Sequence, residues 1–244
     1  SNGSTNYDGT LVRLAGNTTA PAVADFVGYR QVSDGTATLT KGFNDAIMGT
    51  SADNTVTMVG AAEKGDFVNL AGAEDTLVLA NGGNTIDVSG VEHLIGGTGN
   101  DSVGVNLSSP ADFTSALVVG SSFSGGGGHN TLLLSADGAV VRTSGDLAGV
   151  DGFENWVLSS NQFYSLALNN NNVGLGQKLT IAPSSTIEGG ITNQLVIDAS
   201  EVSAGNLILS GGLGDDVLSG GAGNDVFSGG AGDDMLSGGV GLNK

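Results

Sequence analysis

The chain has 244 residues and a formal net charge of −18, because 25 Asp and Glu stand against only 7 Lys and Arg. This acidity argues against nucleic acid and anionic membranes as partners, since both require basic surface, and it predicts cations instead. The absence of cysteine excludes disulfides and thiolate metal sites. No apolar run approaches the roughly 18 residues of a membrane-spanning helix, so we expect no membrane insertion.

Weak copies of a short pattern occupy the first part of the chain. In each copy an Asp or Asn precedes alternating apolar residues, which predicts short β-strands separated by turns. Within each of two groups, consecutive copies are nine residues apart, and the copies begin at Asp45 and Asn54, then at Asp66, Asp75 and Asn84. Asp66 and Asn84 lie 18 positions apart, but the surrounding glycines are missing and Lys64 is close, so we expect a metal-free coil there.

A second motif combines a turn with a short strand. The sequence VSGVEHLI at 88–95 matches VDGFENWV at 150–157, and residues 198–209 form a looser relative. Glu92 and Glu154 hold equivalent places in the motif, and we expect both to form buried hydrogen bonds at a turn. Trp156 is expected in the core.

Three other segments have local signals of their own. Residues 109–119 begin with Ser-Pro-Ala-Asp, a helix-start signal that predicts one short helical turn. Residues 121–130 and 169–177 are rich in glycine or asparagine, which predicts loops that bulge from the coil.

The strongest pattern lies in the last part of the chain. Residues 211–237 repeat Gly-Gly-x-Gly-x-Asp-x-apolar-x three times, which places Asp216, Asp225 and Asp234 nine positions apart. A further copy at 96–104 places Asp101 at the aspartate position. Glycine permits φ > 0, so the turn can direct its carbonyl oxygens inward, and the aspartate adds a charged oxygen. The apolar residue two positions later is expected to point into the coil.

This spacing predicts metal sites between coils. If two nonapeptides complete one coil, Asp216 and Asp234 face one cation, whereas Asp225 pairs with Asn243, whose neutral oxygen weakens the site. A flexible cage of six or more carboxylate and carbonyl oxygens is calcium chemistry rather than magnesium chemistry. The candidate Ca²⁺ ligands are Gly211, Gly212, Gly214, Asp216, Gly220, Gly221, Gly223, Asp225, Gly229, Gly230, Gly232, Asp234 and Asn243, with Gly97, Gly99 and Asp101 upstream.

These residues resemble the RTX, or hemolysin-type, family of calcium-binding repeats. The tandem copies at 211–237 carry most of the resemblance. It implies a right-handed parallel β-roll with calcium between the coils, and export of the unfolded chain by type I secretion to a calcium-rich exterior. The Gly-x-Glu motif also resembles stretches of bacterial surface-layer proteins and large adhesins.

We therefore expect an all-β fold, a right-handed parallel β-solenoid with little helix. Residues 1–204 are expected to form an irregular coil with inserted loops, and residues 205–244 the calcium roll. The repeat pattern runs out at Lys244, which predicts a piece of a longer protein. Unneutralised aspartates in adjacent coils repel one another, and ordering glycine is unfavourable, so the repeats should be disordered without calcium.

The expected function is that of an extracellular calcium-binding structural or adhesive module, secreted or at a bacterial cell surface. Two alternatives stay open: an accessory module of a secreted RTX enzyme, and a β-helix that binds or cleaves acidic polysaccharide. Besides Ca²⁺, the partners to consider are further copies of the chain, through solenoid ends or a surface lattice, and cell-surface polysaccharide. Protease and esterase motifs are absent, and Arg142 near Asp146 and Asp151 is the one central candidate for lyase chemistry, so we expect no enzyme.

Overall fold

The protein is described by a computed structural model that covers residues 29–32, 34–39, 41–42, 44–107, 117, 120–185 and 191–244. These residues form parallel strands in three sheets and contain no helix. The ten-stranded sheet has the order β1 (Tyr29–Gln31), β3 (Ala46–Met48), β5 (Asp66–Asn69), β7 (Thr85–Ser89), β9 (Ser102–Asn106), β11 (Thr131–Ser135), β14 (Asn155–Leu158), β16 (Lys178–Pro183), β18 (Asn206–Ser210) and β20 (Val226–Ser228).

The other two sheets follow one another along the chain. The six-stranded sheet has the order β13 (Val150–Asp151), β10 (Ser122–Ser124), β8 (His93–Ile95), β6 (Thr76–Val78), β4 (Thr55–Val59) and β2 (Asp34–Thr38). The five-stranded sheet has the order β12 (Val140–Arg142), β15 (Tyr164–Ala167), β17 (Leu195–Asp198), β19 (Val217–Ser219) and β21 (Met235–Ser237).

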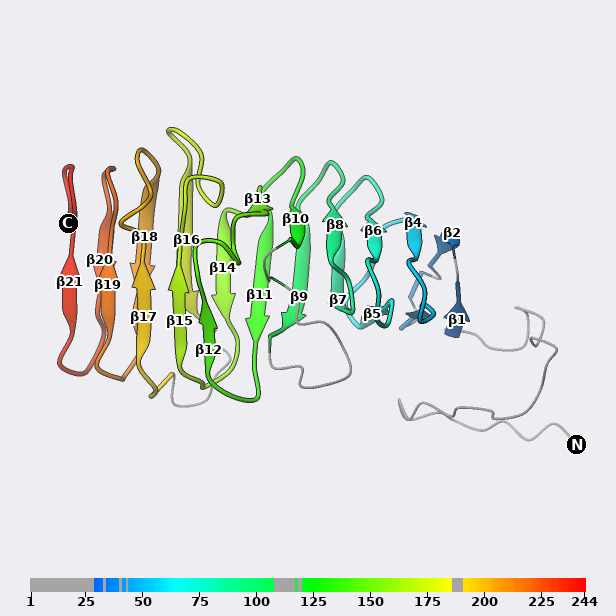
Figure 1. Cartoon of the computed structure of the whole chain (residues 1–244), viewed down its shortest axis with the longest axis horizontal. Coiled ribbons are helices and arrows are strands. Elements are labelled where there is room, and N and C mark those ends of the chain that lie inside the picture. The colour runs from blue at the N-terminus through cyan, green and yellow to red at the C-terminus, as the bar shows by residue number, and fades with distance from the viewer. Residues whose placement is uncertain are drawn as a thin grey trace, which may run out of the picture.

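Successive strands therefore alternate between two walls of a coil, except that two strands outside the ten-stranded sheet, β12 and β13, follow one another between β11 and β14. The chain passes from the ten-stranded sheet to a facing strand and back, and each strand pairs in parallel with its equivalent in the next coil (Figure 1). The result is a β-solenoid of about nine turns, in which the strands stack side by side along the long axis from the N-terminal to the C-terminal coils. The predicted all-β parallel solenoid is confirmed.

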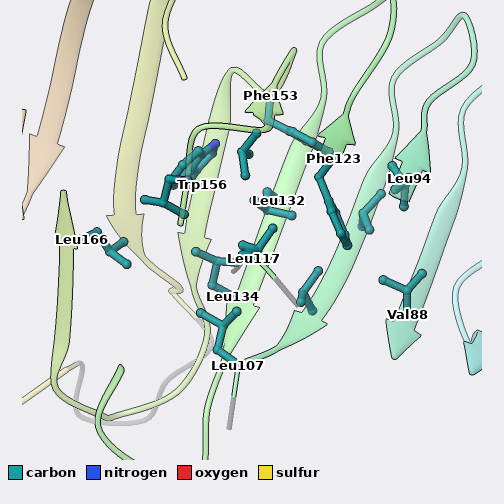
Figure 2. Packing of buried hydrophobic residues seen from close by; sticks show 14 of the residues in the cluster. Val88, Leu94, Leu107, Leu117, Phe123, Leu132, Leu134, Phe153, Trp156 and Leu166 are labelled. Carbon is teal, nitrogen blue, oxygen red and sulfur yellow. The ribbon is translucent and has the colours of Figure 1, made fainter. Parts of the chain in front are cut away.

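The core lies between the two walls and consists of stacked aliphatic residues with a few aromatic ones. Strands such as β11 alternate buried and half-exposed positions, so Leu132 and Leu134 point inward while their neighbours face outward. Figure 2 shows these residues packed with Phe123 and Trp156 from neighbouring strands. Trp156 is buried, as expected from the sequence. Narrow coils need this composition because each strand contributes only one or two inward side chains.

The length of a coil varies along the solenoid. In the tandem repeats, hydrogen-bonded equivalents are 18 residues apart, as the sequence predicts. Upstream, equivalents are separated by as few as 17 residues, between Asn84 and Asp101, or as many as 31, between Tyr164 and Leu195. Extra residues are accommodated in turns, and the strand pairing continues past them. The ten-stranded sheet runs without interruption through β16, β18 and β20, while a domain boundary between residues 204 and 205 stays a prediction.

The loop predictions have mixed outcomes. Residues 169–177 form turns, as expected. The prediction of a loop over 121–130 is wrong at its start, because β10 lies there and pairs with both β8 and β13. Phe123 is the buried apolar residue of this strand, and the many glycines that follow it in the sequence made the segment resemble a loop. The helical turn predicted at 109–119 lies outside the described residues except for Leu117. In the described part of the chain, no helix has the length and hydropathy needed to cross a membrane.

Candidate metal sites

Buried polar residues recur at the start of strands along the solenoid. Each holds the position of the aspartate in the nonapeptide, one residue before the strand begins or, at Asp66, the first residue of the strand. The side chain is a carboxylate or an amide, and it is almost completely excluded from solvent despite its polarity. The buried members of this set are Asp45, Asn54, Asp66, Asp75, Asn84, Glu92, Asp101, Asn130, Asp216 and Asp225.

Hydrogen bonds link these residues from coil to coil, and we call the resulting array the polar ladder. The amide of Asp216 donates to Oδ1 of Asp234 in the next coil over 3.0 Å, and the amide of Leu195 in the preceding coil donates to Oδ1 of Asp216 over 2.7 Å. The amide of Met235 returns to the carbonyl oxygen of Asp216 at 2.8 Å. Each carboxylate thus satisfies a backbone donor in the coil before it.

A second ladder runs along the other wall and contains Asp225. The amide of Leu207 donates to Oδ1 of Asp225 over 2.9 Å, and the amide of Asp225 donates to Oδ1 of Asn243 over 2.9 Å. The structure therefore brings together both residue pairs that the 18-residue spacing predicts, Asp216 with Asp234 and Asp225 with Asn243.

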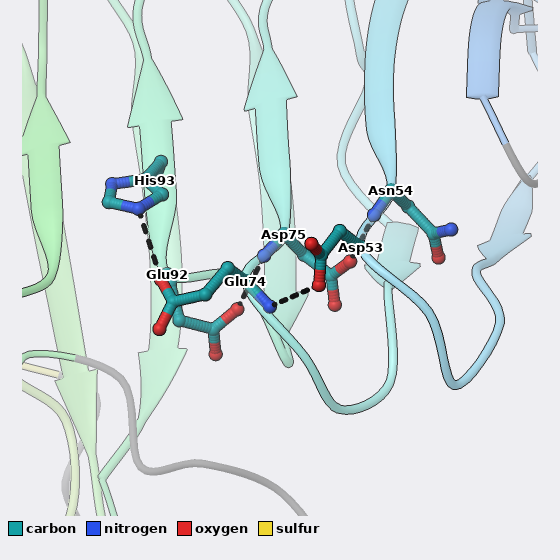
Figure 3. A network of polar contacts seen from close by, with 6 residues as sticks. All are labelled: Asp53, Asn54, Glu74, Asp75, Glu92 and His93. Atoms are coloured by element: carbon teal, nitrogen blue, oxygen red, sulfur yellow. Dashed lines mark hydrogen bonds and ion pairs between the residues drawn. The ribbon is translucent and has the colours of Figure 1, made fainter.

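The same bonding pattern extends into the upstream coils, whose copies of the sequence pattern are weak. Figure 3 shows the amide of Asn54 donating to Asp75 and the amide of Asp75 donating to Glu92, over 2.6 and 2.9 Å. Glu154 likewise accepts the amide of Asn130 over 2.6 Å. The expected buried hydrogen-bond role is confirmed for Glu92, whereas Glu154 forms its hydrogen bond from a half-buried position. A glutamate reaches the ladder with one more methylene, which the match between 88–95 and 150–157 already indicated.

Cradles of oxygens lie beside Asp216 and Asp225 in the tandem repeats. A Cβ atom placed on Gly211 would lie 2.1 Å from Oδ2 of Asp216 and 2.1 Å from the carbonyl oxygen of Gly229 in the next coil. At Gly220 the corresponding atoms are Oδ2 of Asp225, at 2.3 Å, and the carbonyl oxygen of Gly238, at 2.9 Å. At Gly211 carboxylate and carbonyl oxygens from adjacent coils therefore face a common point, whereas at Gly220 the ring atom Cζ of Phe227 also lies 2.8 Å from the added Cβ.

The repeat glycines serve mainly to allow this close approach. Only in the last tandem repeat do they adopt positive φ, 105° at Gly230 and 118° at Gly232. The positive φ that glycine permits is therefore not used in the first two tandem copies. Their glycines are needed for space, because a Cβ on Gly223 would lie 2.0 Å from the carbonyl oxygen of Gly205, and one on Gly221 would lie 2.1 Å from that of Val202.

Two repeat aspartates leave one carboxylate oxygen without a hydrogen-bond partner. Oδ2 of Asp225 and Oδ2 of Asp101 are both buried and accept no hydrogen bond. An unpaired carboxylate oxygen in the interior is unfavourable unless a cation or proton neutralises it. Oδ2 of Asp216 instead accepts the amide of Gly212 over 2.7 Å. The donor set of hard oxygens at these positions fits Ca²⁺.

Asp75 also has a buried, unpaired Oδ2 but lacks the cradle. The residue five positions before it is Leu70, which is buried, where the tandem repeats have glycine. A leucine side chain takes the place of the glycine here, so we assign no metal to this coil.

Burial raises the pKa of two aspartates in the ladder, Asp216 and Asp75. Desolvation raises the pKa of Asp216; its bonds from Gly212 and Leu195 oppose the shift, and the charges of Asp234 and Asp215 reinforce it. Desolvation likewise raises the pKa of Asp75 to about 6. These shifts mean that the folded coil, without a cation, favours the protonated carboxyl. A bound cation removes the same penalty by compensating the charge.

The described residues contain no group of three or more Asp, Glu, His or Cys side chains that could hold a metal. The cradles use a different donor set, in which backbone carbonyl oxygens supplement one carboxylate from each coil. Oxygen ligands of both kinds are typical of calcium sites. In each cradle Ca²⁺ would be held by the aspartate and by glycine carbonyls, and it would neutralise the buried charge.

Comparison with known families gives a match at these same positions. The family model of the RTX calcium-binding nonapeptide repeat matches residues 88–103 and 210–243, with 4 copies. The chain carries RTX calcium-binding repeats. The RTX match includes Asp101, Asp216, Asp225 and Asp234. No curated protein and no solved structure matches the chain.

The RTX repeats anchor their coils to the core to different extents. The apolar residue two positions after the aspartate is fully buried at Leu218 and Val103, as predicted. Phe227 packs partly against the core, and Leu236 is 46% exposed because β21 is the edge strand of its sheet. The hydrophobic contribution to stability therefore declines toward the last RTX coil, where calcium has the most to supply.

Proposed function

We propose that the chain is an extracellular module that binds calcium, folds on binding it after export, and has a structural or adhesive role at a bacterial surface. The observation that carries this proposal is the row of RTX aspartates whose carboxylates face glycine carbonyls of the next coil, as at Gly211 and Gly220. The acidic composition, with a net charge of −18, supports the same assignment.

The proposed folding switch follows from the energetics of the cradle. Without a cation, the buried carboxylates of Asp216 and Asp225 face carbonyl oxygens, and electrostatic repulsion opposes stacking of the coils. Calcium binds only the stacked state, so its binding free energy adds to folding. Extracellular modules bind calcium with Kd of about 10⁻⁴ to 10⁻³ M, so the repeats would stay open in a calcium-poor cytoplasm. Each site adds about 2.7 kcal/mol when free calcium reaches 100 times Kd.

The first experiment is a calcium titration followed by far-UV circular dichroism and thermal melting, repeated with magnesium. We expect calcium alone to add β signal and raise the melting temperature. The double variant Asp216→Ala, Asp234→Ala should lose most of this response. The matched control is Asp215→Ala, Asp233→Ala, which removes the same charge from exposed positions one residue away and should keep the response. A protein whose spectra ignore calcium would refute the proposal.

A surface role and an accessory role predict different behaviour. A surface-layer or adhesive module should assemble when calcium is added, which light scattering and electron microscopy detect. A monomer at high protein and calcium concentrations would count against assembly. An accessory module of a secreted enzyme should instead stay monomeric beside its catalytic domain. The parent gene distinguishes the two, because a hydrolase domain in the same reading frame would identify the accessory role.

A lyase-like function has less support. The Arg142 guanidinium donates to the carbonyl oxygens of Val141 and Leu107, which favours a structural role for this side chain. Burial lowers the pKa of Arg142, and the nearby charge of Asp146 opposes that shift. Incubation with alginate or pectin tests the alternative directly, since a lyase would produce unsaturated sugar ends that absorb in the ultraviolet.

A further inference from the structure

Asn130 occupies the ladder position that aspartate holds in the tandem RTX repeats. It precedes β11 and is fully buried. Its Oδ1 accepts the amide of Asp101 over 2.9 Å, just as Oδ1 of Asp234 accepts the amide of Asp216. The side chain is therefore a full member of the ladder, with one oxygen used in the same way as in an aspartate coil.

The backbone around Asn130 repeats the geometry of the calcium cradle. A Cβ placed on Gly125, five positions before Asn130, would lie 2.1 Å from the carbonyl oxygen of Gly152 in the next coil. The same 2.1 Å separates a Cβ on Gly211 from the carbonyl oxygen of Gly229. Gly125 and Gly152 directly follow β10 and β13, which pair with each other. Gly211 and Gly229 likewise follow the paired strands β18 and β20.

The two cradles differ in one atom of the ladder side chain. At Gly211 the second atom near the added Cβ is the carboxylate oxygen of Asp216, whereas at Gly125 it is the amide nitrogen Nδ2 of Asn130, at 2.9 Å. Two oxygens that face each other require a cation between them. The Asn130 amide needs none, because Nδ2 donates directly to the carbonyl oxygen of Gly152 over 2.8 Å.

Asn84 provides an independent second case. Its Nδ2 lies 2.9 Å from the carbonyl oxygen of Ala80, 3.0 Å from that of Gly82 and 2.7 Å from Oδ1 of Asp101. The first two carbonyls come from positions four and two residues before the ladder residue, which Gly212 and Gly214 hold in a tandem repeat. Loop carbonyls and the next coil's carboxylate thus surround an amide nitrogen, in the way that oxygen ligands surround a cation.

We infer that the side-chain amides of Asn84 and Asn130 replace the divalent cation in their coils, which therefore stack without calcium, and that Asn130→Asp creates a further calcium site. This inference rests on the proposed calcium function of the tandem repeats and deepens it. The residue at the ladder position, asparagine or aspartate, determines whether a coil needs a metal ion to stack. The coils of Asn84 and Asn130 then stack without calcium, whereas the coil of Asp101 between them keeps a buried carboxylate oxygen without a partner.

Hydrogen exchange with mass spectrometry tests this coil by coil, in EDTA and in calcium. In the wild type, amides of β11 should stay protected in EDTA, while those of β19 should be protected only in calcium. In Asn130→Asp, we expect β11 exchange in EDTA to be about tenfold faster or more, because a buried hydrogen bond is lost and a charge is left unpaired. Calcium should restore β11 protection, and calorimetry should count one further bound ion per chain.

The matched control is Asn100→Asp, which adds the same charge in the adjoining coil. Asn100 is exposed and directly precedes the ladder residue Asp101. It should leave both the ion count and the exchange of β11 unchanged. Asn130→Ala removes the amide without adding a ligand, so it should weaken β11 equally with and without calcium.

The possible failures can be told apart. If β11 of the wild type loses protection in EDTA, the amides do not replace the metal and the inference is wrong. It is equally wrong if Asn130→Asp gains no ion, or if this variant stays unfolded in calcium while Asn130→Ala folds. If β19 of the wild type ignores calcium, the proposed function itself fails, whatever happens at β11.

Discussion

Replacing Asp75 with asparagine should stabilise the protein above neutral pH and remove one source of its pH dependence. Oδ1 of Asp75 accepts the amide of Asn54 over 2.6 Å, and an asparagine oxygen can do the same. Oδ2 is buried without a partner, so the charged form of Asp75 is poorly accommodated. Asparagine already occupies the equivalent ladder position at Asn54, Asn84 and Asn130.

The magnitude follows from the pKa of Asp75, which desolvation, together with the charges of Glu92, Asp53 and Glu74, raises from 3.8 to about 6. Below pH 3.8 both the folded and the unfolded chain are protonated at this site. Between pH 3.8 and 6 only the folded chain keeps the proton, so stability falls as pH rises. Above pH 6 the full penalty is present, and a shift of about two units corresponds to about 3 kcal/mol.

The assay is urea denaturation in EDTA between pH 4 and pH 8, monitored by the fluorescence of Trp156. The difference in free energy of unfolding between Asp75→Asn and wild type should grow from near zero at pH 4 to at most about 3 kcal/mol at pH 8. Glu74→Gln is the control, because its side chain is 76% exposed and its loss removes a similar charge without altering the buried position. It should change stability by less than about 1 kcal/mol.

A constant difference across this pH range would refute the reasoning, since it would mean that Asp75 titrates alike in the folded and unfolded chain. A variant less stable than wild type at pH 8 would refute it as well.

Two further substitutions test the cradle and the core. Gly211→Ala should abolish most of the calcium-induced rise in melting temperature, because the new methyl group would lie 2.1 Å from two oxygens, whereas Gly138→Ala, with open space around it, should leave the rise intact. Trp156→Ala should lower the free energy of unfolding by about 3 to 5 kcal/mol in calcium-saturated denaturation experiments. Trp156→Phe should lower it much less, because the phenyl ring keeps most of the buried apolar surface and the indole N–H that is lost has no acceptor. Equal losses for the two tryptophan variants would contradict this account.

The sequence predicts the C-terminal coils well because nothing interrupts their period. With a strict nine-residue repeat, Asp216 and Asp234 had to meet if two repeats make a coil, and the 18-residue bond between them confirms it. The alternation after each aspartate likewise identified Leu218 as a core residue.

The middle coils were harder to predict because coil length there is set by turns rather than by strands. Asp101 and Asn130 are partners across 29 residues, and Asn130 and Glu154 across 24, so no fixed period links them. Local signals were still present, since Asn130 precedes an alternating strand as Asn84 does. What the sequence alone could not convey is that an asparagine and an aspartate hold equivalent places in the ladder.

The constancy of the polar ladder alongside variable coil length has a consequence for protein engineering. Since each coil is held to the next at the ladder and the strands, extra sequence accumulates in turns without shifting the register of its neighbours. Turns such as residues 169–177 are therefore natural insertion points for foreign peptides. Epitopes displayed in the turns of successive coils would be separated by a distance fixed by strand stacking, close to 4.8 Å per coil. The distance between the first and the last displayed epitope would then be set by the number of coils between them.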